Sequence, residues 1–283
     1  MSVSLPKTLI DKKDRAQISA SIKAPQLSVS SRIRKITEFI KNQVSQSGAK
    51  GIVLGISGGI DSAVTAALCT KALGPTKVTG VLMFEDHLHN SIDFSDAKGL
   101  IRLLRINNID LPISPMVQAF ESSLRSRRFA ISKITSANIK ARSRMVLLYS
   151  IANERNLLVA GTGDKSEIME GYFTKFGDGA ADILPIAHLY KTEVRALGET
   201  LKLPVRIITK PSSPNLWSGQ VATEELPADY DVIDRVLSLL NESRTSARKI
   251  SQLLKVRQEI VNEIIHRFVI SEHKRKLPAS VTS

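Results

Sequence analysis

The sequence of 283 residues has one cysteine, one tryptophan and no apolar run long enough to cross a lipid bilayer. With Cys69 alone, neither a disulfide nor a cysteine cluster for a metal can form within one chain. Cys69 falls in an apolar helical pattern, which is typical of a small buried side chain. Residues 1–28 lack the apolar core of a secretory leader. These absences favour a globular protein of a reducing compartment, and we expect it to be cytoplasmic, without membrane attachment.

Acidic residues are scarce relative to basic ones. There are 27 Asp and Glu against 40 Lys and Arg, which gives a net charge of +13. Such a charge favours polyanionic partners, including nucleotides, nucleic acids and anionic lipids, and composition does not choose among them. Two classes stay open at this stage: a small-molecule ATP-dependent ligase and an RNA-modifying enzyme.

What the sequence does contain is a glycine-rich turn between a buried strand and a helix. The strand is predicted at Ile52–Ile56 and the helix at Ser62–Leu73, with Ser57-Gly58-Gly59-Ile60-Asp61-Ser62 between them. Backbone N–H groups and the positive helix end then point at one spot, which suits a phosphate. The two serines add hydroxyl donors, and Asp61 can hold a magnesium ion. The order S-G-G-x-D-S resembles the loop of enzymes that cleave ATP between its α and β phosphates, and it is not a Walker loop.

Strands and helices alternate over most of the chain after residue 28. Further strand patterns fall at Lys77–Phe84, Ile106–Ile113 and Leu157–Ala160, and the apolar run Ile183–Ile186 lies further on. Helical patterns run from Ser30 or Ser31 to Gly48, and over Asp93–Leu104, Met116–Leu124 and Ala137–Glu154. The alternation predicts an α/β fold with a doubly wound, Rossmann-like parallel sheet, for which we expect five strands flanked by helices. Ligands bind such sheets at the carboxyl ends of the strands, which is where the glycine-rich turn lies.

Polar side chains also follow the strand predicted at Leu157–Ala160. Thr162 can donate to a nucleotide, and Glu167 can supply a second carboxylate for magnesium. Taken alone, they are more often an N-cap residue and a first-turn acid. The segment 210–220, KPSSPNLWSGQ, is a long loop of the kind that often forms a lid.

The most basic internal stretch, Arg125–Arg144, contains no acidic residue and mainly predicts a solvated helix face. Arg142 and Arg144 lie near the start of the next helix and could face either solvent or the cleft. The C-terminal part is helical, with helices expected at Ala228–Leu240, Ser246–Leu254 and Arg257–Ile270. The last two resemble a helix-turn-helix, but such hairpins also pack as ordinary helical corners, and DNA binding is not our main reading.

Several long motifs in order, GISGGIDS, GTGDKSEIMEGYFTKFGDGAADILPIAHLYKTEVRAL, KPSSPNLWSGQ and HKRKLP, make the chain similar to ammonia-dependent NAD synthetases. The resemblance covers roughly residues 30–278. It implies an adenine nucleotide alpha hydrolase-like fold in one domain, residues 29–278, with a flexible basic arm at 1–28 and a tail at 279–283. It also implies a homodimer that condenses deamido-NAD with ammonia, using ATP and Mg²⁺ and releasing AMP and pyrophosphate through an acyl-adenylate.

The resemblance also implies roles for individual residues. ATP would be bound by Gly55, Ile56, Ser57, Gly58, Gly59, Ile60, Asp61 and Ser62, together with Thr162, Lys191 and Ser212, and magnesium by Asp61 and Glu167. Deamido-NAD would be bound by Arg142, Lys175, Asp182, His273 and Lys274. Asp61, Lys191 and Asp178 would be catalytic, with Asp178 holding ammonium or accepting its proton. No side chain is an evident nucleophile, because the substrate carboxylate attacks ATP itself.

Some positions depart from the family pattern. Val221-Ala222-Thr223-Glu224 and Glu225-Leu226-Pro227 stand where the family has an acidic pair followed by Glu-Leu-Gly, so closure of the loop could differ. Phe84 replaces a common proline, and Ser212 replaces a frequent threonine while keeping the hydroxyl. Two alternatives therefore stay open: a tRNA-modifying ATP pyrophosphatase, and a deamido-NAD- and ATP-binding protein with impaired turnover. Nucleic acid is not the expected partner, and a separate glutaminase could supply the ammonia.

Overall fold

The computed structural model describes residues 28–86, 91–214, 216–217, 220–243 and 245–281. Nearly all of the predicted basic arm lies outside these residues, as do the last two residues of the predicted tail. Within the described part of the chain, no helix is long and apolar enough to cross a membrane.

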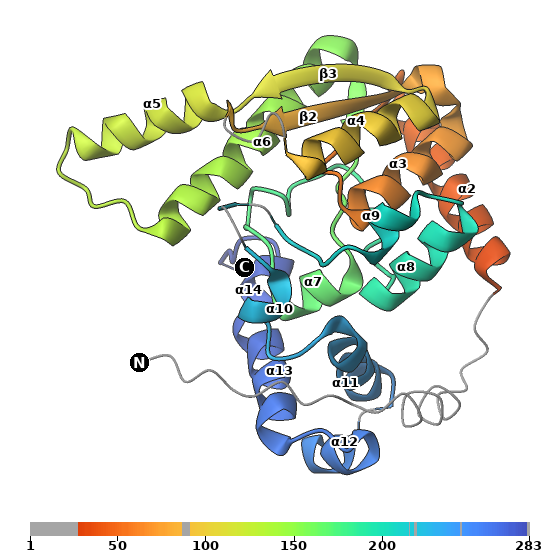
Figure 1. Ribbon diagram of the computed structural model, residues 1–283, viewed down its shortest axis with the longest axis vertical. Helices are drawn as coiled ribbons and strands as arrows, with labels where there is room; N and C mark the ends of the chain where they lie inside the picture. The colour runs from red at the N-terminus through yellow and green to blue at the C-terminus, as the bar shows by residue number, and fades with distance from the viewer. Residues whose placement is uncertain (1–27, 87–90, 215, 218–219, 244, 282–283) are drawn as a thin grey trace.

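A four-stranded parallel sheet lies at the centre of the larger part of the molecule (Figure 1). Its strand order is β3-β2-β1-β4. The strands are β1 (Gly51–Gly55), β2 (Val78–Phe84), β3 (Asn107–Pro112) and β4 (Leu157–Val159). Since the chain runs outward from β1 to β3 and then returns to β4 on the other side, the predicted doubly wound parallel sheet is confirmed.

The prediction of five strands is wrong. Where a fifth strand would extend the sheet, only an isolated parallel bridge joins Ala160 to Ile183. Two features end the ladder there: the Asp182 carboxylate accepts a hydrogen bond from the Val159 N–H at 2.7 Å, and Pro185 has no N–H to donate. The segment after β4 therefore crosses the sheet edge as a loop.

Helices cover both faces of the sheet. One face is covered by α2 (Val29–Ser47), α3 (Ile60–Leu73) and α4 (Ile92–Leu104), backed by α8 (Lys191–Thr200) and α9 (Val205–Thr209). The other face is covered by α6 (Lys133–Arg155), which is preceded by α5 (Ser114–Arg125). Alternation along β1 explains the two layers: Ile52 and Leu54 pack with α2 and α3, while Val53 packs with the α6 side.

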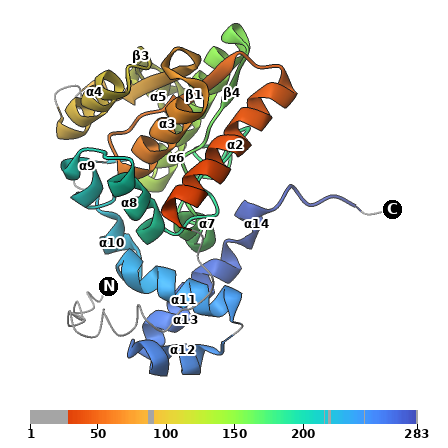
Figure 2. The ribbon, with the colours of Figure 1, turned by 90° about the vertical axis from the view of Figure 1, so that its right-hand side faces the viewer.

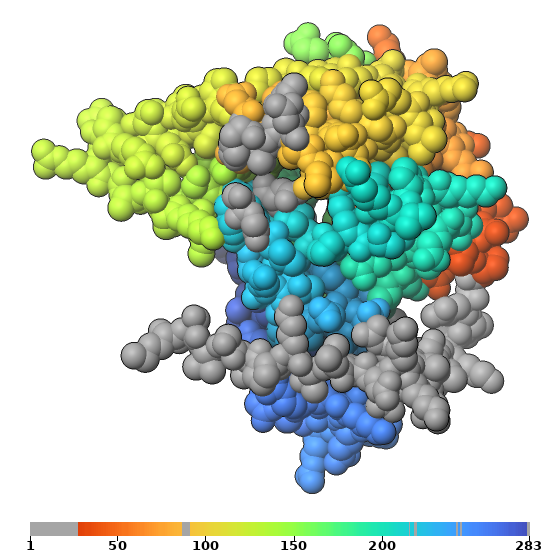
Figure 3. Space-filling view, in the orientation of Figure 1, coloured from red at the N-terminus to blue at the C-terminus, as the bar shows by residue number. Residues whose placement is uncertain are grey.

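Side-chain caps set several helix starts. Ser28 accepts from the Ser31 N–H at 3.2 Å, so α2 begins at Val29, one or two residues before the predicted start. Gly48, with φ of 68°, ends α2 as predicted, because the left-handed conformation suits glycine. The α5–α6 hairpin stands out from the rest of the surface (Figure 3).

The C-terminal helices lie together below the sheet (Figure 2), and their buried side chains form a second apolar core. They are α10 (Ala222–Glu225), α11 (Tyr230–Glu242), α12 (Ala247–Leu254), α13 (Gln258–Ile270) and α14 (Glu272–Arg275). Ile250 and Leu254 of α12 pack with Val261 and Ile264 of α13 in this core, together with α11. The helix-turn-helix pattern thus serves as a packed helical corner, and α7 (Lys165–Glu170) joins it to the sheet edge.

Candidate active site

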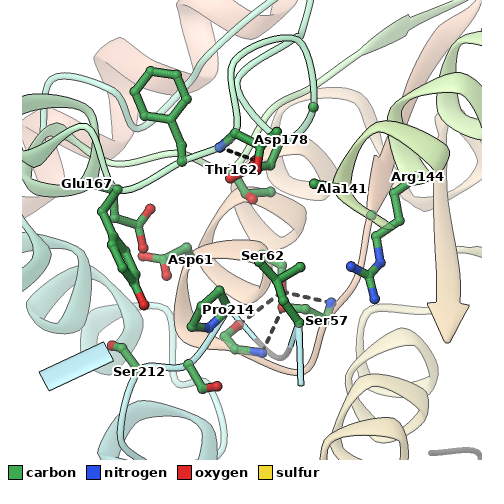
Figure 4. A pocket seen from close by; sticks show the side chains of 18 of the residues that line it. Ser57, Asp61, Ser62, Ala141, Arg144, Thr162, Glu167, Asp178, Ser212 and Pro214 are labelled. Atoms are coloured by element: carbon green, nitrogen blue, oxygen red, sulfur yellow. Dashed lines mark hydrogen bonds between the residues drawn. The ribbon is translucent and has the colours of Figure 1, made fainter. Parts of the chain in front are cut away.

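A cavity of about 700 Å³ lies at the carboxyl edge of the sheet. Its walls are the glycine-rich turn after β1, the end of β2, one face of α6, the loop 171–180, residues 210–214, and the start of the C-terminal helices. Figure 4 shows side chains from these separate segments facing one space. The position agrees with the prediction that ligands bind where the strands end.

The glycine-rich turn is held in shape by its own two serines. Ser62 Oγ accepts from the Ser57 N–H at 3.3 Å and donates to the Gly59 carbonyl at 3.0 Å, and Ser57 Oγ accepts from the Gly59 N–H at 3.2 Å. Gly58 has φ of 79°, and a Cβ there would lie 2.4 Å from the Asp93 carbonyl oxygen. The turn delivers the α3 N-terminus to the cavity, which is the geometry expected of a phosphate site.

Lys191 forms a buried ionic cluster with three carboxylates beside this turn. Its Nζ lies 2.7 Å from Asp61 Oδ2, 2.8 Å from Asp164 Oδ2 and 2.7 Å from Glu167 Oε1. The side chains of Lys191 and Asp164 are fully buried, whereas those of Asp61 and Glu167 keep 19% and 21% exposed. The inner pair therefore supports two carboxylates that line the cavity.

The cluster shifts the pKa values of its members. Burial raises the pKa of Asp164 well above its usual range, and burial likewise raises the pKa of Glu167 to about 7, although Lys191 opposes both shifts. The three carboxylates raise the pKa of Lys191 against its own desolvation. One ammonium therefore faces three acidic groups, and the cluster keeps an excess of acidic groups for a further cation.

The acidic groups fit a divalent cation. One oxygen each of Asp61, Asp164 and Glu167 lies within 4.8 Å of the others. Asp61 Oδ1 is buried and has no hydrogen-bond partner among the described residues. A hard oxygen donor left unpaired at the edge of a cavity matches what Mg²⁺ requires.

Other predicted ATP and ammonia residues also line the cavity: Gly55, Ile56, Ser57, Gly59, Ile60, Ser62, Thr162, Ser212 and Asp178. Asp178 Oδ1 accepts from the Thr174 N–H at 2.8 Å, and burial raises the pKa of Asp178. Ser212 Oγ is buried without a hydrogen-bond partner among the described residues. Gly58 shapes the turn without lining the cavity, and Lys191 lies behind the wall.

The residues predicted for deamido-NAD are more dispersed. Arg142 is exposed and donates to the Lys175 carbonyl oxygen at 3.3 Å. Lys175 Nζ donates to the His273 carbonyl oxygen at 2.8 Å, and Lys274 Nζ donates to Gly171 and Phe173 carbonyl oxygens at 2.7 and 2.9 Å. Asp182 binds the end of β4. Of these five, only Lys274 lines the cavity.

Sequence reasoning missed Asp164 and left Arg144 undecided. Asp164 caps α7 by accepting from the Glu167 N–H at 2.8 Å, and the Glu167 carboxylate accepts from the Asp164 N–H at 3.4 Å. The capping-box spacing D-x-x-E predicts that Asp164 caps a helix, but it does not show that the same carboxylate also contacts Lys191. Arg144 faces the cavity, a choice that depends on how α6 packs against the sheet.

Part of the segment that departs from the family pattern, Ala222–Glu225, forms the short helix α10. Ala222 and Thr223 open α10, and Ala222 is 1% exposed and lines the cavity. Glu225 accepts from Tyr172 Oη at 3.1 Å and from Gln220 Nε2 at 2.9 Å, which ties the end of the 210–220 segment to the loop after α7.

The chain is similar to known proteins over most of its length. The family model described as NAD synthase matches residues 32–278. The chain belongs to the NAD synthase family. The NH3-dependent NAD+ synthetase of Hyperthermus butylicus is 43% identical over 245 residues, 87% of this chain and 88% of that protein. That of Methanocaldococcus jannaschii is 44% identical over 248 residues, 87% and 94% of the two chains.

Solved structures show the same fold. The NMN synthetase from Francisella tularensis has a TM-score of 0.78 and 34% identity, covering 91% of this chain and all of that one. The NH3-dependent NAD synthetase from Campylobacter jejuni has a TM-score of 0.76 and 30% identity, covering 90% and 100%. The predicted activity, a C–N ligase that amidates deamido-NAD with ammonia at the expense of ATP, is confirmed by this membership.

Proposed function

We propose that the cavity is the single site of both half-reactions, adenylation of deamido-NAD and attack by ammonia. The observation that carries this is the convergence of the SGGIDS turn, the carboxylates of the Lys191 cluster and Asp178 on one cavity. We propose further that residues 29–278 act as one domain, because the cavity has walls from both the sheet and the C-terminal helices.

In the first half-reaction, a carboxylate oxygen of deamido-NAD attacks the α-phosphorus of ATP and the bond to pyrophosphate breaks. The turn N–H groups and the hydroxyls of Ser57 and Ser62 bind the departing phosphates, at the positive end of α3. Thr162 and Ser212 orient the nucleotide through their hydroxyls. In the structure the Ser57 and Gly59 N–H groups and the Ser62 hydroxyl donate within the turn, so these donors exchange partners when the phosphates bind.

Asp61 and Glu167 would hold Mg²⁺ at the phosphates. The ion neutralises phosphate charge when bound. Lys191 keeps both carboxylates aimed into the cavity while Asp164 fixes Lys191 from behind. In this arrangement Lys191 is a positioning residue whose cationic charge prevents the carboxylates from repelling one another and the substrate.

In the second half-reaction, ammonia attacks the activated carbonyl, the bond to AMP breaks, and a proton leaves the nitrogen. Asp178 is placed to hold the incoming ammonium or to accept that proton. Its raised pKa makes it a better base than an aspartate of ordinary pKa. Lys274 contacts the dinucleotide from the cavity wall, while Arg142, Lys175, Asp182 and His273 would contact its outer half.

We propose a homodimer that acts in the cytoplasm. Large apolar side chains are exposed on and beside the α5–α6 hairpin: Phe120, Phe129 and Ile134 have 53%, 62% and 70% of their surface accessible. A second copy of the chain would cover them. Light scattering of the purified protein measures its mass in solution and so its oligomeric state, with Phe129→Ser as the comparison.

The mononucleotide is a second candidate substrate, favoured by the likeness to the NMN synthetase. The deciding experiment measures NAD and AMP from deamido-NAD, ATP, Mg²⁺ and ammonium, with nicotinic acid mononucleotide and glutamine in parallel reactions. Equimolar NAD and AMP, formed only with ammonium, support the proposed reaction. Preference for the mononucleotide by kcat/KM would replace the substrate, and absence of both products would contradict the proposal.

A further inference from the structure

Arg144 lies on the cavity-facing side of α6. Ala141, Arg144, Met145 and Leu148 all line the cavity, and their spacing of three, four and seven residues puts them on one helix face. Arg142 lies off this face, where it is exposed and donates to the Lys175 carbonyl oxygen. Of the two arginines that the sequence left open, Arg144 is therefore the one that can reach a ligand in the cavity.

Arg144 is anchored through one end of its guanidinium. Nε donates to the Met83 carbonyl oxygen at 3.2 Å. Gly55 pairs with Val81 in the sheet, so the Met83 carbonyl lies just beyond the end of β1, level with the glycine-rich turn. Figure 4 shows the guanidinium extending toward Ser57. The two Nη atoms donate to no group among the described residues, which leaves them available to a ligand.

The other cations lining the cavity are more fully engaged. Lys210 Nζ lies 3.1 Å from Asp96 Oδ2 and also bonds Asp93. Lys274 Nζ is bonded to two carbonyl oxygens, and Arg267 pairs with Glu170 through Nε at 3.0 Å. Among the described residues that line the cavity, Arg144 thus has the planar donor edge best placed for a phosphate.

Two carboxylates, those of Glu85 and Asp178, favour the charged form of Arg144. Burial lowers the pKa of the Arg144 guanidinium, and Glu85 and Asp178 oppose that shift. Glu85 is itself paired with Lys140 at 2.8 Å. Arg144 lines the same cavity as Asp178, where we place ammonia, and the turn, where we place the outer phosphates (Figure 4). We place the α-phosphate, which reacts in both steps, in the space between these two positions.

We propose that Arg144 is a catalytic residue that binds the α-phosphate through both half-reactions, an inference that rests on the proposed function. In the first, it binds nonbridging oxygens as the carboxylate–phosphorus bond forms and the bond to pyrophosphate breaks. In the second, the carbon–oxygen bond breaks and AMP takes the electron pair, so its phosphate gains negative charge beside the same guanidinium. A two-pronged donor can follow one phosphate through both steps without moving.

The test compares Arg144→Gln and Arg144→Lys with Arg155→Gln, which removes an exposed arginine at the far end of the same helix. Two rates are measured: NAD formation at saturating substrates, and exchange of labelled pyrophosphate into ATP with deamido-NAD but no ammonium. For Arg144→Gln we expect both to fall about 100-fold or more, with the KM for deamido-NAD changed less than about threefold. Added guanidinium should restore part of the rate, and Arg155→Gln should match the wild type.

A wild-type exchange rate in Arg144→Gln, or a loss confined to the KM for deamido-NAD, would overturn the assignment. Where circular dichroism shows that Arg144→Gln does not fold, Arg144→Lys decides, because one ammonium cannot make the two parallel bonds. A tenfold or greater fall in its exchange rate supports the proposal, and an unchanged rate overturns it. The wild-type reaction tests the proposed function separately. If the wild-type protein forms no NAD, the proposed function is contradicted, whatever the variants do.

Discussion

Charged side chains surround the cavity in two different ways. The Lys191 ammonium lies 2.7 to 2.8 Å from one oxygen of each of three acidic side chains. The side chains of Lys191 and Asp164 are wholly buried. At the outer rim, Arg142 and Lys175 are not buried, and each is shown bonding a carbonyl oxygen rather than a carboxylate. The inner groups are fixed before any ligand arrives, whereas the outer ones keep most of their hydration. The comparison indicates that loss of an inner group affects both folding and rate, while loss of an outer group affects binding alone.

The largest effect is expected for Lys191→Met. Removing the ammonium leaves Asp61, Asp164 and Glu167 facing one another without a cation, so we expect a loss of about 3–5 kcal/mol in the free energy of unfolding. NAD formation should fall at least about 1000-fold. Urea unfolding and initial rates measure the two effects. Lys71→Met, at an exposed position on α3, is the matched control. If Lys191→Met is as stable as the wild type, inner and outer charged groups do not differ in their effect on folding.

The next prediction concerns a second inner pair, Glu170 with Arg267. Burial raises the pKa of Glu170 to about 7 from its model-compound value of 4.5, although Arg267 opposes the shift. The folded state therefore holds this proton more tightly than the unfolded state. Relative to Glu170→Gln, the wild type should lose stability as pH rises from about 4.5 through about 7, by at most about 3 kcal/mol.

Urea unfolding of both proteins at several pH values between 5 and 8 checks the Glu170 prediction. The quantity of interest is the difference between the two free energies of unfolding, because other titrating groups cancel in it. Glu272→Gln serves as the control, since Glu272 is an exposed carboxylate on α14. A difference that stays constant with pH would show that Glu170 is ionised throughout and belongs with the outer groups.

A smaller effect is expected for Asp178→Asn. The amide keeps the size of the carboxyl but cannot take a proton from ammonium, so kcat/KM for ammonium should fall about 100-fold. Exchange of pyrophosphate into ATP should change little, because that step precedes the attack of ammonia. If the dependence of the rate on ammonium is unchanged in Asp178→Asn, Asp178 has no role in the second half-reaction.

The smallest effect belongs to the outer rim. Lys175→Ala should raise the KM for deamido-NAD about three- to tenfold and leave kcat and stability close to wild type, because the lost charge is solvated. Added salt should reduce the difference between wild type and variant. Lys35→Ala, at an exposed position on α2, controls for a general change in net charge. An unchanged KM in Lys175→Ala would refute the assignment of Lys175 to deamido-NAD.

Much of the fold was predictable because each element is specified locally. The strand patterns located β1 to β4 within about two residues, and Gly48 ended α2 as its left-handed conformation allows. The fifth strand was not predictable from the apolar run Ile183–Ile186. The Asp182 carboxylate takes the Val159 N–H, and Pro185 has no N–H to donate, so the ladder does not continue. Only the register against β4 shows that these two residues fall where the ladder would continue.

The sequence by itself determined the glycine-rich turn at the helix start, since two glycines, two serines and a helix start within six residues leave few other conformations. It also determined the family, through motifs spread over most of the chain. Only the tertiary structure decided that Asp164 joins Asp61 and Glu167 around Lys191, and that Arg144 rather than Arg142 faces the cavity. The reason is physical: the contact of Lys191 with Asp61 joins residues 130 positions apart, the orientation of Arg144 depends on the rotation of α6 against the sheet, and no local pattern encodes either.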